Sequence, residues 1–154
     1  MVSVPRLYEK VFITAHSKVA ASPAKKKVFD WAFRVGGQCQ RAYRKGKEPA
    51  LYWKAQLPLA DKLVFSSIRD AMGGPKAVMA CGGAPLRREI EEFFSAAGML
   101  LSQGYGLTEA APLVSFNSPG AFKFGTVGRV LHGAEVLIAV VGGDLFRVPH
   151  LLTG

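Results

Sequence analysis

The sequence predicts an α/β fold, in which a helical N-terminal segment precedes part of a mixed, mainly parallel sheet with flanking helices. Two observations carry this prediction. In the first half of the chain, apolar residues recur at the three- and four-residue spacing of amphipathic helices. In the second half, short apolar runs alternate with glycine-rich turns in the order strand, loop, helix, strand. We therefore expect one incomplete domain with two parts, a basic helical segment at 1–75 and a strand–loop–helix–strand unit with the start of a further β subdomain at 76–154.

The first half is expected to contain three helices. The first spans 6–20, since four apolar residues recur there at every fourth position: Leu7, Val11, Ala15 and Val19. A second helix begins near Pro23, a residue type that suits the first helical turn. Gly36-Gly37 is expected to weaken or end that helix, because glycine is a poor helix former. A polar connection over 41–49 leads to the third helix, which the Gly73-Gly74-Pro75 run stops.

The second half is expected to begin with two buried strands around one helix. The strands are the apolar runs at 77–80 and 99–102, and the helix spans 86–97 with an apolar inner face. A right-handed connection of this kind places both strands in one parallel sheet. Two further strands, 135–141 and 144–148, are predicted to form a hairpin across the glycines between them.

Two glycine-rich loops leave the predicted parallel strands on the same side of the sheet. Gly82-Gly83-Ala84-Pro85 follows the first strand, and the stretch from Gln103 to Glu109 follows the second. Ligands collect at the carboxyl ends of parallel strands, and glycines let the backbone approach a flat or anionic ligand closely. Tyr105 offers a ring face, Thr108 a hydroxyl, and Glu109 a hard oxygen ligand for Mg²⁺. Each loop alone is more often a simple turn, but together they predict a nucleotide site.

Three motifs, in this order along the chain, resemble the core of the adenylate-forming superfamily, which includes acyl-CoA synthetases, luciferases and peptide-synthetase adenylation domains. The motifs are Gly82 to Leu86, Gln103 to Glu109, and Gly125-Thr126-Val127-Gly128. The run from Val4 to Lys10, with the basic helices through 29–32, narrows the resemblance to the long-chain fatty-acyl-CoA synthetases. Nearly the whole chain takes part in this resemblance.

The resemblance implies an ATP site in which the first glycine loop lines the adenine pocket. Gly104 and Tyr105 would flank the base, with the Tyr105 ring stacked on it. Thr108 would bind the α-phosphate and Glu109 would help to hold Mg²⁺, so these two are the expected catalytic residues. The expected nucleotide-binding residues together are Gly82, Gly83, Ala84, Pro85, Gln103, Gly104, Tyr105, Gly106 and Thr108.

The same resemblance implies a long-chain-fatty-acid–CoA ligase. Enzymes of this kind join a fatty acid to AMP with loss of pyrophosphate from ATP, and then pass the acyl group to the thiol of coenzyme A. Cys39 and Cys81 form neither a disulfide framework nor a metal-ligand spacing, so a reduced, cytoplasmic setting is expected. The sequence contains no Ser/Thr/Gly-rich phosphate loop ending in Pro-Lys-Gly, no Tyr-x-x-Gly-Asp segment and no domain with the family's catalytic lysine. We therefore expect a fragment of the N-terminal adenylation domain that is inactive on its own.

The net charge of +9 arises in the first half, where 14 Lys and Arg residues occur with 5 Asp and Glu residues. A solvated helical face is its simplest interpretation. The other interpretation is peripheral attachment at the inner, anionic face of a membrane, with the cluster Lys25-Lys26-Lys27, beside Phe29, the first part to touch lipid. No apolar run is long enough for a membrane-spanning helix.

Two other functions stay open at this stage: an adenylation fragment for another carboxylate, and a non-catalytic basic module for nucleic acid or an anionic membrane. Four aromatic residues interleaved with basic ones suggest the module: Trp31, Tyr43, Tyr52 and Trp53. Nucleic acid is not the favoured partner, because Trp31 lies on an apolar helical stripe and no RNA-binding signature occurs. Cys81 is expected to be a small buried residue and not a reactive thiol.

Overall fold

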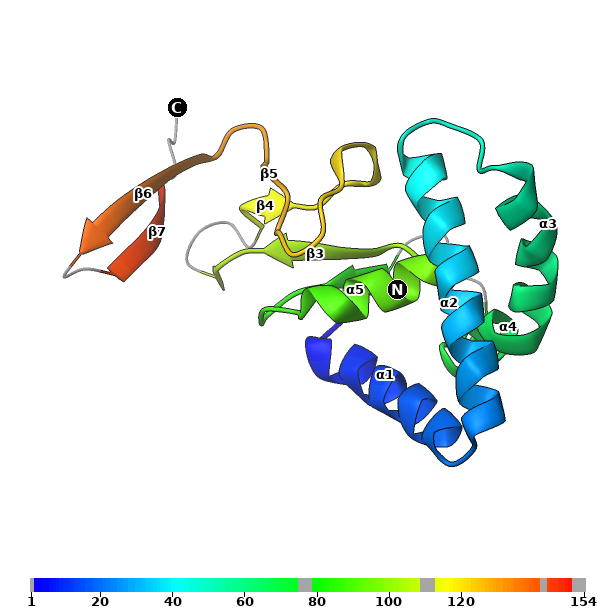
Figure 1. The fold of residues 1–154 in the computed structure, drawn as a ribbon. Coiled ribbons are helices and arrows are strands. Elements are labelled where there is room, and N and C mark those ends of the chain that lie inside the picture. The colour runs from blue at the N-terminus through cyan, green and yellow to red at the C-terminus, as the bar shows by residue number, and fades with distance from the viewer. Residues whose placement is uncertain (1, 75–78, 109–112, 142–143, 151–154) are drawn as a thin grey trace.

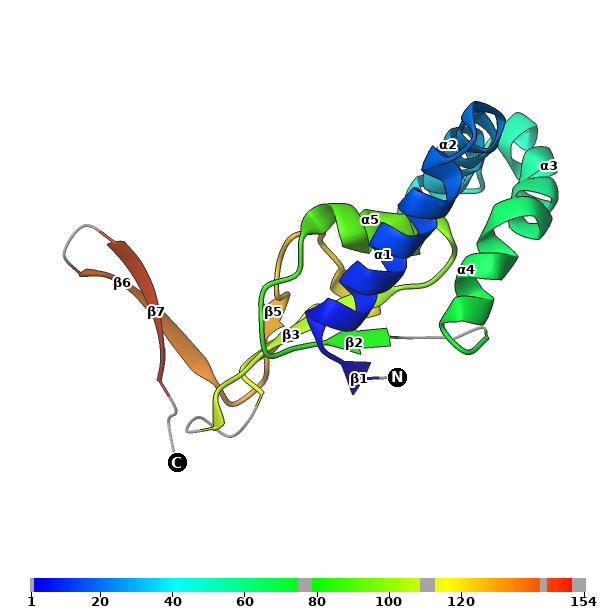
Figure 2. The same cartoon turned by 90° about the horizontal axis from the view of Figure 1, so that it is seen from below.

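The computed structural model of the chain describes residues 2–74, 79–108, 113–141 and 144–150, and it confirms the predicted α/β architecture. The helices are α1 (Pro5–Ala20), α2 (Pro23–Arg44), α3 (Leu51–Ala60), α4 (Ser66–Ala71) and α5 (Arg88–Ala96). The strands are β1 (Val2–Ser3), β2 (Met79–Cys81), β3 (Leu101–Tyr105), β4 (Ser115–Phe116), β5 (Arg129–Val130), β6 (Glu135–Val141) and β7 (Asp144–His150). Figures 1 and 2 show α1 and α5 on the same face of the parallel strands, with α2 lying against α5.

The helix α2 runs straight through Gly36-Gly37, so the expectation that this pair would end the helix was wrong. A Cβ atom at Gly36 would collide with the backbone carbonyl of Ala96 and with the ring of Phe65. Glycine in a helix costs about 0.5–1 kcal/mol relative to alanine, and the close packing that Gly36 permits offsets this cost. The helix also includes 41–44, which the sequence had assigned to a polar connection.

The third predicted helix is present, but it changes geometry along its length. Between α3 and α4 lies a π-helical turn, Asp61–Phe65, and Pro58 precedes it inside α3. A π turn holds one residue more than an α turn between its hydrogen-bonded groups. An ion pair spans this turn, since both guanidinium nitrogens of Arg69 bond the carboxylate of Asp61 at 2.6 and 2.7 Å. Arg69 also donates to the Ala97 carbonyl, which ties the turn to the end of α5.

The main sheet has the strand order β1-β2-β3-β4-β5. The three strands β1, β2 and β3 are parallel, whereas β3, β4 and β5 pair antiparallel, so the sheet is mixed as predicted. The sequence did not predict β1, β4 or β5, because two residues are too few to show an alternating pattern. The strand β3 continues to Tyr105, so the part of the second glycine-rich loop at 103–105 is strand and not loop.

The predicted hairpin is confirmed as β6 and β7, which form a separate two-stranded antiparallel sheet. Its register pairs Glu135 with His150 and Val141 with Asp144, so β7 ends two residues later than the sequence indicated. The glycine turn between these strands, 142–143, lies outside the described residues. The predicted strand at 77–80 is confirmed for its last two residues and continues to Cys81. Residues 77–78 lie outside the described residues.

One hydrophobic core contains residues from both halves of the chain. From α5, Ile90, Phe93 and Phe94 face inward as predicted. The ring of Phe94 meets the ring of Tyr8 edge to face, with 5.6 Å between centroids. The hydroxyl of Tyr8 donates to the Ala80 carbonyl at 3.0 Å, which joins α1 to β2. The helical segment and the sheet therefore fold together, and the division at residue 75 stays a prediction.

The side chain of Phe29 is 6% exposed and lies among the rings of Phe33 and Phe93. The neighbouring residues Lys25-Lys26-Lys27 are exposed. Within the described ranges, no helix combines the length and the apolar character that crossing a bilayer requires. Attachment to a membrane surface stays a prediction.

Candidate functional site

A cavity of about 790 Å³ lies where the parallel strands β2 and β3 end. Its size is within the range of small-molecule sites, roughly 300–1,000 Å³. Three backbone segments form its walls, and they are far apart in the sequence. They are the glycine loop after β2, the end of β3 with the residues that follow, and the segment that leads into β5. The lining residues are Gly83, Ala84, Pro85, Leu86, Gln103, Gly104, Tyr105, Gly106, Leu107, Ala121, Lys123, Gly125, Thr126, Val127, Gly128 and Arg129.

The glycine loop leaves the sheet directly after Cys81. Gly83 has a φ of +86°, a backbone conformation that favours glycine over any residue with a Cβ. The loop is held at both ends, because the Gly82 N–H donates to the Ser3 carbonyl and the Leu86 N–H donates to the side-chain oxygen of Gln103. Backbone at Gly83 and Ala84 is thereby exposed toward the cavity while its ends stay fixed.

A buried hydrogen-bond chain connects the three walls. The side chain of Gln103 accepts from Leu86 at 3.1 Å and donates to a carboxylate oxygen of Glu91 at 2.8 Å. The other oxygen of Glu91 accepts from the Gly125 N–H at 2.5 Å. Glu91 is 0% exposed and Gln103 is 5% exposed. The structure shows the polar atoms of Gln103 fixing the two loops, and the expectation that Gln103 also binds nucleotide stays a prediction.

The ionisation of Glu91 is perturbed by this environment. Burial raises the pKa of Glu91 above its ordinary value, and the hydrogen bonds from Gly125 and Gln103 oppose that rise. The sequence had placed residue 91 only within the predicted helix 86–97. Nothing in the helical pattern distinguishes its buried carboxyl from the exposed carboxylates of Glu89 and Glu92 beside it.

The third wall is folded around a buried side chain, Asn117, which is 0% exposed. Its amide nitrogen donates to the carbonyls of Lys123 and Thr126, and its oxygen accepts from the Lys123 N–H at 3.0 Å. Gly128 has a φ of +79°, and a Cβ there would collide with the backbone of Phe116 and Asn117. The motif from Gly125 to Gly128 was recognised in the sequence, but its contribution to the cavity wall was not predicted.

The charge at the cavity is positive. Among the described residues that line it, Lys123 and Arg129 are charged and none is acidic. Both side chains are exposed, so they present mobile positive charge to a ligand and not a rigid clamp. Neither was selected from the sequence, although they flank the Gly125 to Gly128 motif, and that position was the signal that would have found them.

The structure brings together most of the predicted nucleotide-binding residues: Gly83, Ala84, Pro85, Gln103, Gly104, Tyr105 and Gly106 all line the cavity. Gly82 lies just below the lining, at the end of β2, and Thr108 is exposed and outside it. Glu109, the predicted magnesium ligand, lies outside the described residues, so the metal assignment stays a prediction. In the described part of the chain, no group of three His, Cys, Asp or Glu side chains is placed to hold a metal ion.

The cysteine beside the glycine loop is buried, as predicted. Cys81 is 2% exposed, and burial raises the pKa of its thiol to about 11, with further contributions from the negative charges of Glu91 and Glu9. Cys39 is also buried, and burial raises its pKa. A thiol of this kind is protonated at neutral pH, so neither cysteine has the properties of a nucleophile.

Comparison with known proteins gives the family. The sequence profile of the family described as AMP-binding enzyme matches residues 1–147. The long-chain-fatty-acid–CoA ligase FadD15 of Mycobacterium bovis is 35% identical over 154 residues, which is 100% of this chain and 25% of that protein. The long chain acyl-CoA synthetase 2 of Arabidopsis thaliana is 35% identical over 150 residues, with 93% of this chain and 21% of that protein covered.

Among solved structures, a variant of E. coli MenE with bound OSB-AMS is 30% identical over 47% of this chain and 15% of its own, with a TM-score of 0.34. The chain spans about a quarter of the length of the FadD15 ligase that it matches. The profile match covers all three walls of the cavity, from the glycine loop to the segment before β5. This chain belongs to the AMP-binding enzyme family.

Proposed function

We propose that the chain is part of an adenylate-forming, long-chain-fatty-acid–CoA ligase and that the cavity at the ends of β2 and β3 holds the adenosine part of ATP. In the complete enzyme, a fatty-acid carboxylate attacks the α-phosphorus of ATP, pyrophosphate leaves, and the acyl-AMP then reacts with the thiol of coenzyme A, which releases AMP. The names of the relatives support the substrate class. The expectation that the 154 residues alone are inactive stays a prediction.

The observation that carries the proposal is the convergence of three recognised motifs on one cavity with a positive rim. Gly83, Ala84 and Pro85 line the cavity, and so does Tyr105 at the end of β3, whose ring can stack on a base. Lys123 and Arg129 on the third wall attract phosphate charge. An adenine ring and its phosphates have this combination of a flat apolar part and an anionic part.

In the proposed reaction, the main task of the protein is to position the carboxylate and the α-phosphate of ATP. A carboxylate is already a nucleophile, so no side chain has to remove a proton from it, and the rate depends on positioning and on stabilising the charge of the phosphate oxygens. In this chain, the Gln103–Glu91–Gly125 hydrogen-bond chain supplies the positioning, because it fixes the two glycine segments relative to each other. We assign the α-phosphate contact to Thr108 and the magnesium contact to Glu109 as proposals.

The placement of the two tryptophans does not favour the alternative of a basic nucleic-acid module, although Tyr43 and Tyr52 are exposed. Trp31 donates to Gln56 at 2.8 Å across the α2–α3 packing, and both Trp31 and Trp53 pack against the core. Their rings are therefore used inside the helical segment. An adenylation fragment for a different carboxylate has the same nucleotide site, so the acyl group is the part of the proposal that needs separate support.

Nucleotide binding by the 154-residue chain is the direct test. We expect AMP to bind, measured by isothermal titration calorimetry, and Tyr105→Ala to weaken binding by about 1–3 kcal/mol, the range for stacking of a base on an aromatic ring. Tyr52→Ala is the matched control, since Tyr52 is 68% exposed and does not line the cavity. Equal affinity of both variants would contradict the assignment of this cavity to the base.

The magnesium and fatty-acid parts of the proposed function are tested in a complete enzyme. We expect a ligase whose corresponding segment is replaced by this chain to activate palmitate, and Glu109→Ala in that chimera to raise the Mg²⁺ concentration needed for half-maximal acyl-AMP formation. Unchanged magnesium dependence would remove Glu109 from the site. Activation of a short or aromatic acid in place of palmitate would support the alternative, an adenylation fragment for a different carboxylate.

A further inference from the structure

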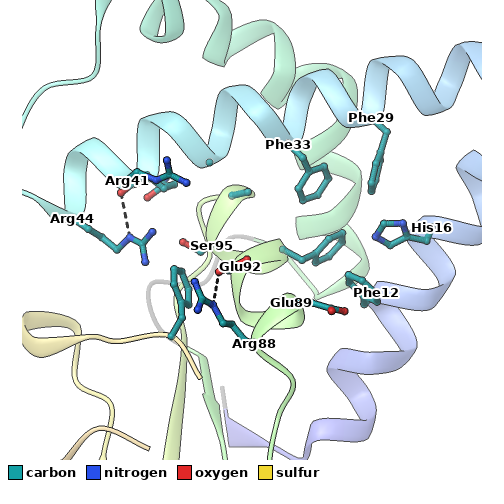
Figure 3. A pocket seen from close by; sticks show the side chains of 15 residues that line it. Phe12, His16, Phe29, Phe33, Arg41, Arg44, Arg88, Glu89, Glu92 and Ser95 are labelled. Atoms are coloured by element: carbon teal, nitrogen blue, oxygen red, sulfur yellow. Dashed lines mark hydrogen bonds and ion pairs between the residues drawn. The ribbon is translucent and has the colours of Figure 1, made fainter. Parts of the chain in front are cut away.

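A second cavity, of about 490 Å³, lies between α1, α2 and α5 and shares no lining residue with the candidate nucleotide site. Figure 3 shows that its two ends differ: phenylalanine rings gather at one end and arginines at the other. One helix connects the ends, because Phe29, Phe33, Gly37, Arg41 and Arg44 all line the cavity from α2. Their spacing of three or four residues places them on one face of that helix.

The aromatic end is a continuous apolar surface. The rings of Phe33 and Phe93 are stacked with 4.9 Å between centroids, and Phe29 lies beside both. Phe12 from α1 meets Phe93 edge to face at 5.1 Å. Phe33 and Phe12 are only partly buried, so their rings still offer area to a bound apolar group.

The basic end holds two arginines without a carboxylate partner. Neither Arg41 nor Arg44 forms an ion pair within the described residues, whereas Arg88 nearby is paired with Glu92 at 2.7 Å. The guanidinium of Arg44 lies 4.1 Å from the ring centroid of Phe124, which holds it in place. Burial lowers the pKa of Arg44, the positive charge of Arg41 lowers it further, and the negative charge of Glu92 opposes both without reversing the shift. The charges of the two arginines therefore repel one another at this end. An anion placed between them relieves that repulsion.

The middle of the groove is open. A Cβ atom built at Gly37 meets no atom within 4 Å, in contrast to the crowded Gly36 beside it. From Phe29 to Arg41 the helix rises by roughly 18 Å, at 1.5 Å per residue. The acyl chains of one membrane leaflet fill half of a hydrocarbon core of about 30 Å, which is a similar length. A straight, unbranched chain therefore matches the distance between the two ends.

We propose that this groove binds a long-chain fatty acid, with its carboxylate between Arg41 and Arg44 and its chain over Gly37 onto the rings of Phe33 and Phe29. Glu89 favours this direction, since Figure 3 shows its carboxylate on the side of Phe12, where it repels an anion. The other carboxylate that lines the cavity, Glu92, lies at the arginine end and is paired with Arg88 at 2.7 Å. The site is an accessory acyl-binding site beside the nucleotide cavity. Binding of the fatty acid at this site depends on the groove alone and requires neither ATP nor turnover.

Equilibrium dialysis of radiolabelled palmitate against the 154-residue chain tests the proposal, at palmitate concentrations below micelle formation. We expect saturable binding of one palmitate, at least tenfold weaker binding of the uncharged hexadecanol, and at least a tenfold loss for the double variant Arg41→Gln/Arg44→Gln. Lys45→Gln/Lys47→Gln is the matched control, because these exposed lysines lie on the same chain segment and do not line the groove. The control is expected to bind palmitate within twofold of the wild type.

A size series at Gly37 tests the path of the chain without changing charge. Gly37→Ala is expected to leave binding within twofold, and Gly37→Trp to abolish it, while the circular dichroism spectrum of both variants stays that of the wild type. Should a variant lose its fold, crosslinking of a diazirine-labelled palmitate to the wild type replaces it, with the label expected on the peptides that contain Phe33 and Phe93. Absent binding, equal binding of hexadecanol, or full binding by Gly37→Trp would each overturn the proposal.

The test also separates this groove from the nucleotide site. Tyr105→Ala is expected to weaken AMP binding and to leave palmitate binding unchanged, whereas the arginine double variant is expected to do the reverse. Loss of palmitate binding in Tyr105→Ala would place the fatty acid in the nucleotide cavity and overturn the accessory site.

Discussion

Removal of the buried carboxyl of Glu91 is expected to destabilise the chain and to loosen the candidate site at the same time. Glu91→Ala leaves two donors without this acceptor, the buried side-chain amide of Gln103 and the Gly125 N–H, which lies in a partly buried contact. An unsatisfied buried donor costs about 1–3 kcal/mol, and water can reach the exposed Gly125, so the expected cost is about 1–3 kcal/mol and comes mainly from Gln103. Glu91→Gln keeps one acceptor oxygen and is expected to cost about half as much.

The measurement is urea unfolding of the 154-residue chain at pH 7, followed by far-ultraviolet circular dichroism. Glu92→Ala is the matched control, because its exposed carboxylate only pairs with Arg88 on the surface of α5. Such a pair contributes about 0.5 kcal/mol or less. Amide hydrogen exchange at Gly125 gives a local readout and is expected to speed up in Glu91→Ala alone. The reasoning fails if the two alanine variants unfold within about 0.5 kcal/mol of each other and Gly125 exchange is unchanged.

The same carboxyl predicts a pH dependence. Burial raises the pKa of Glu91 above 4.5, so the folded chain keeps this proton to a higher pH than the unfolded chain does. The stability that this proton contributes is therefore complete below the unfolded pKa and is lost as the pH rises through the raised pKa, whereas the hydrogen bonds from Gly125 and Gln103 to the carboxylate remain at pH 7. We expect Glu91→Gln to flatten the fall in stability just above pH 4.5; a slope identical to the wild type would show that another group causes it.

Three further predictions rest on single contacts. Gly36→Ala is expected to lower the unfolding free energy in urea by about 1–3 kcal/mol, because its Cβ overpacks against Ala96. Gly37→Ala is expected to raise it by up to about 1 kcal/mol, because its Cβ meets no other atom. Equal effects of the two variants would refute the packing account. Cys81, with a pKa of about 11, is expected to resist a disulfide reagent at pH 8 until urea unfolds the chain, and rapid labelling of the folded chain would contradict its burial. Tyr8→Phe removes the donor to the Ala80 carbonyl and is expected to lower the unfolding free energy by about 1 kcal/mol; an unchanged Tm would argue against this bond.

The sequence was informative where local pattern decides structure. The repeat in α1, the inward face of α5 and the β6–β7 hairpin depend on residues close together in the chain, and all three are confirmed. It failed at Gly36, where the packing of α5 and Phe65 outweighs helix propensity. It also failed for β1, whose two residues become a strand only because β2, nearly 80 residues later, pairs with them.

The candidate site shows the same division. Glycines of the two loops were found because a motif fixes their order, and the parallel pairing of β2 with β3 brings the loops to one cavity. Glu91 and Asn117 were missed, since a buried polar side chain has the same letters as an exposed one, and only the fold decides which groups it meets. Lys123 and Arg129 were missed for a related reason: the turn built on Asn117 carries them to the cavity.

The π-helical turn at Asp61–Phe65 holds one residue more than an α-helical turn, so the deletion of one residue there would restore an ordinary α-helix and keep the following residues on the same face. The deletion of one residue elsewhere in α3 or α4 would instead rotate everything after it by about 100°. Ile68 and Met72, now 6% exposed each, would then turn away from the core. In homologous chains, deletions of one residue are therefore expected at this turn and at 45–49, the connection after α2, and not within α3 or α4.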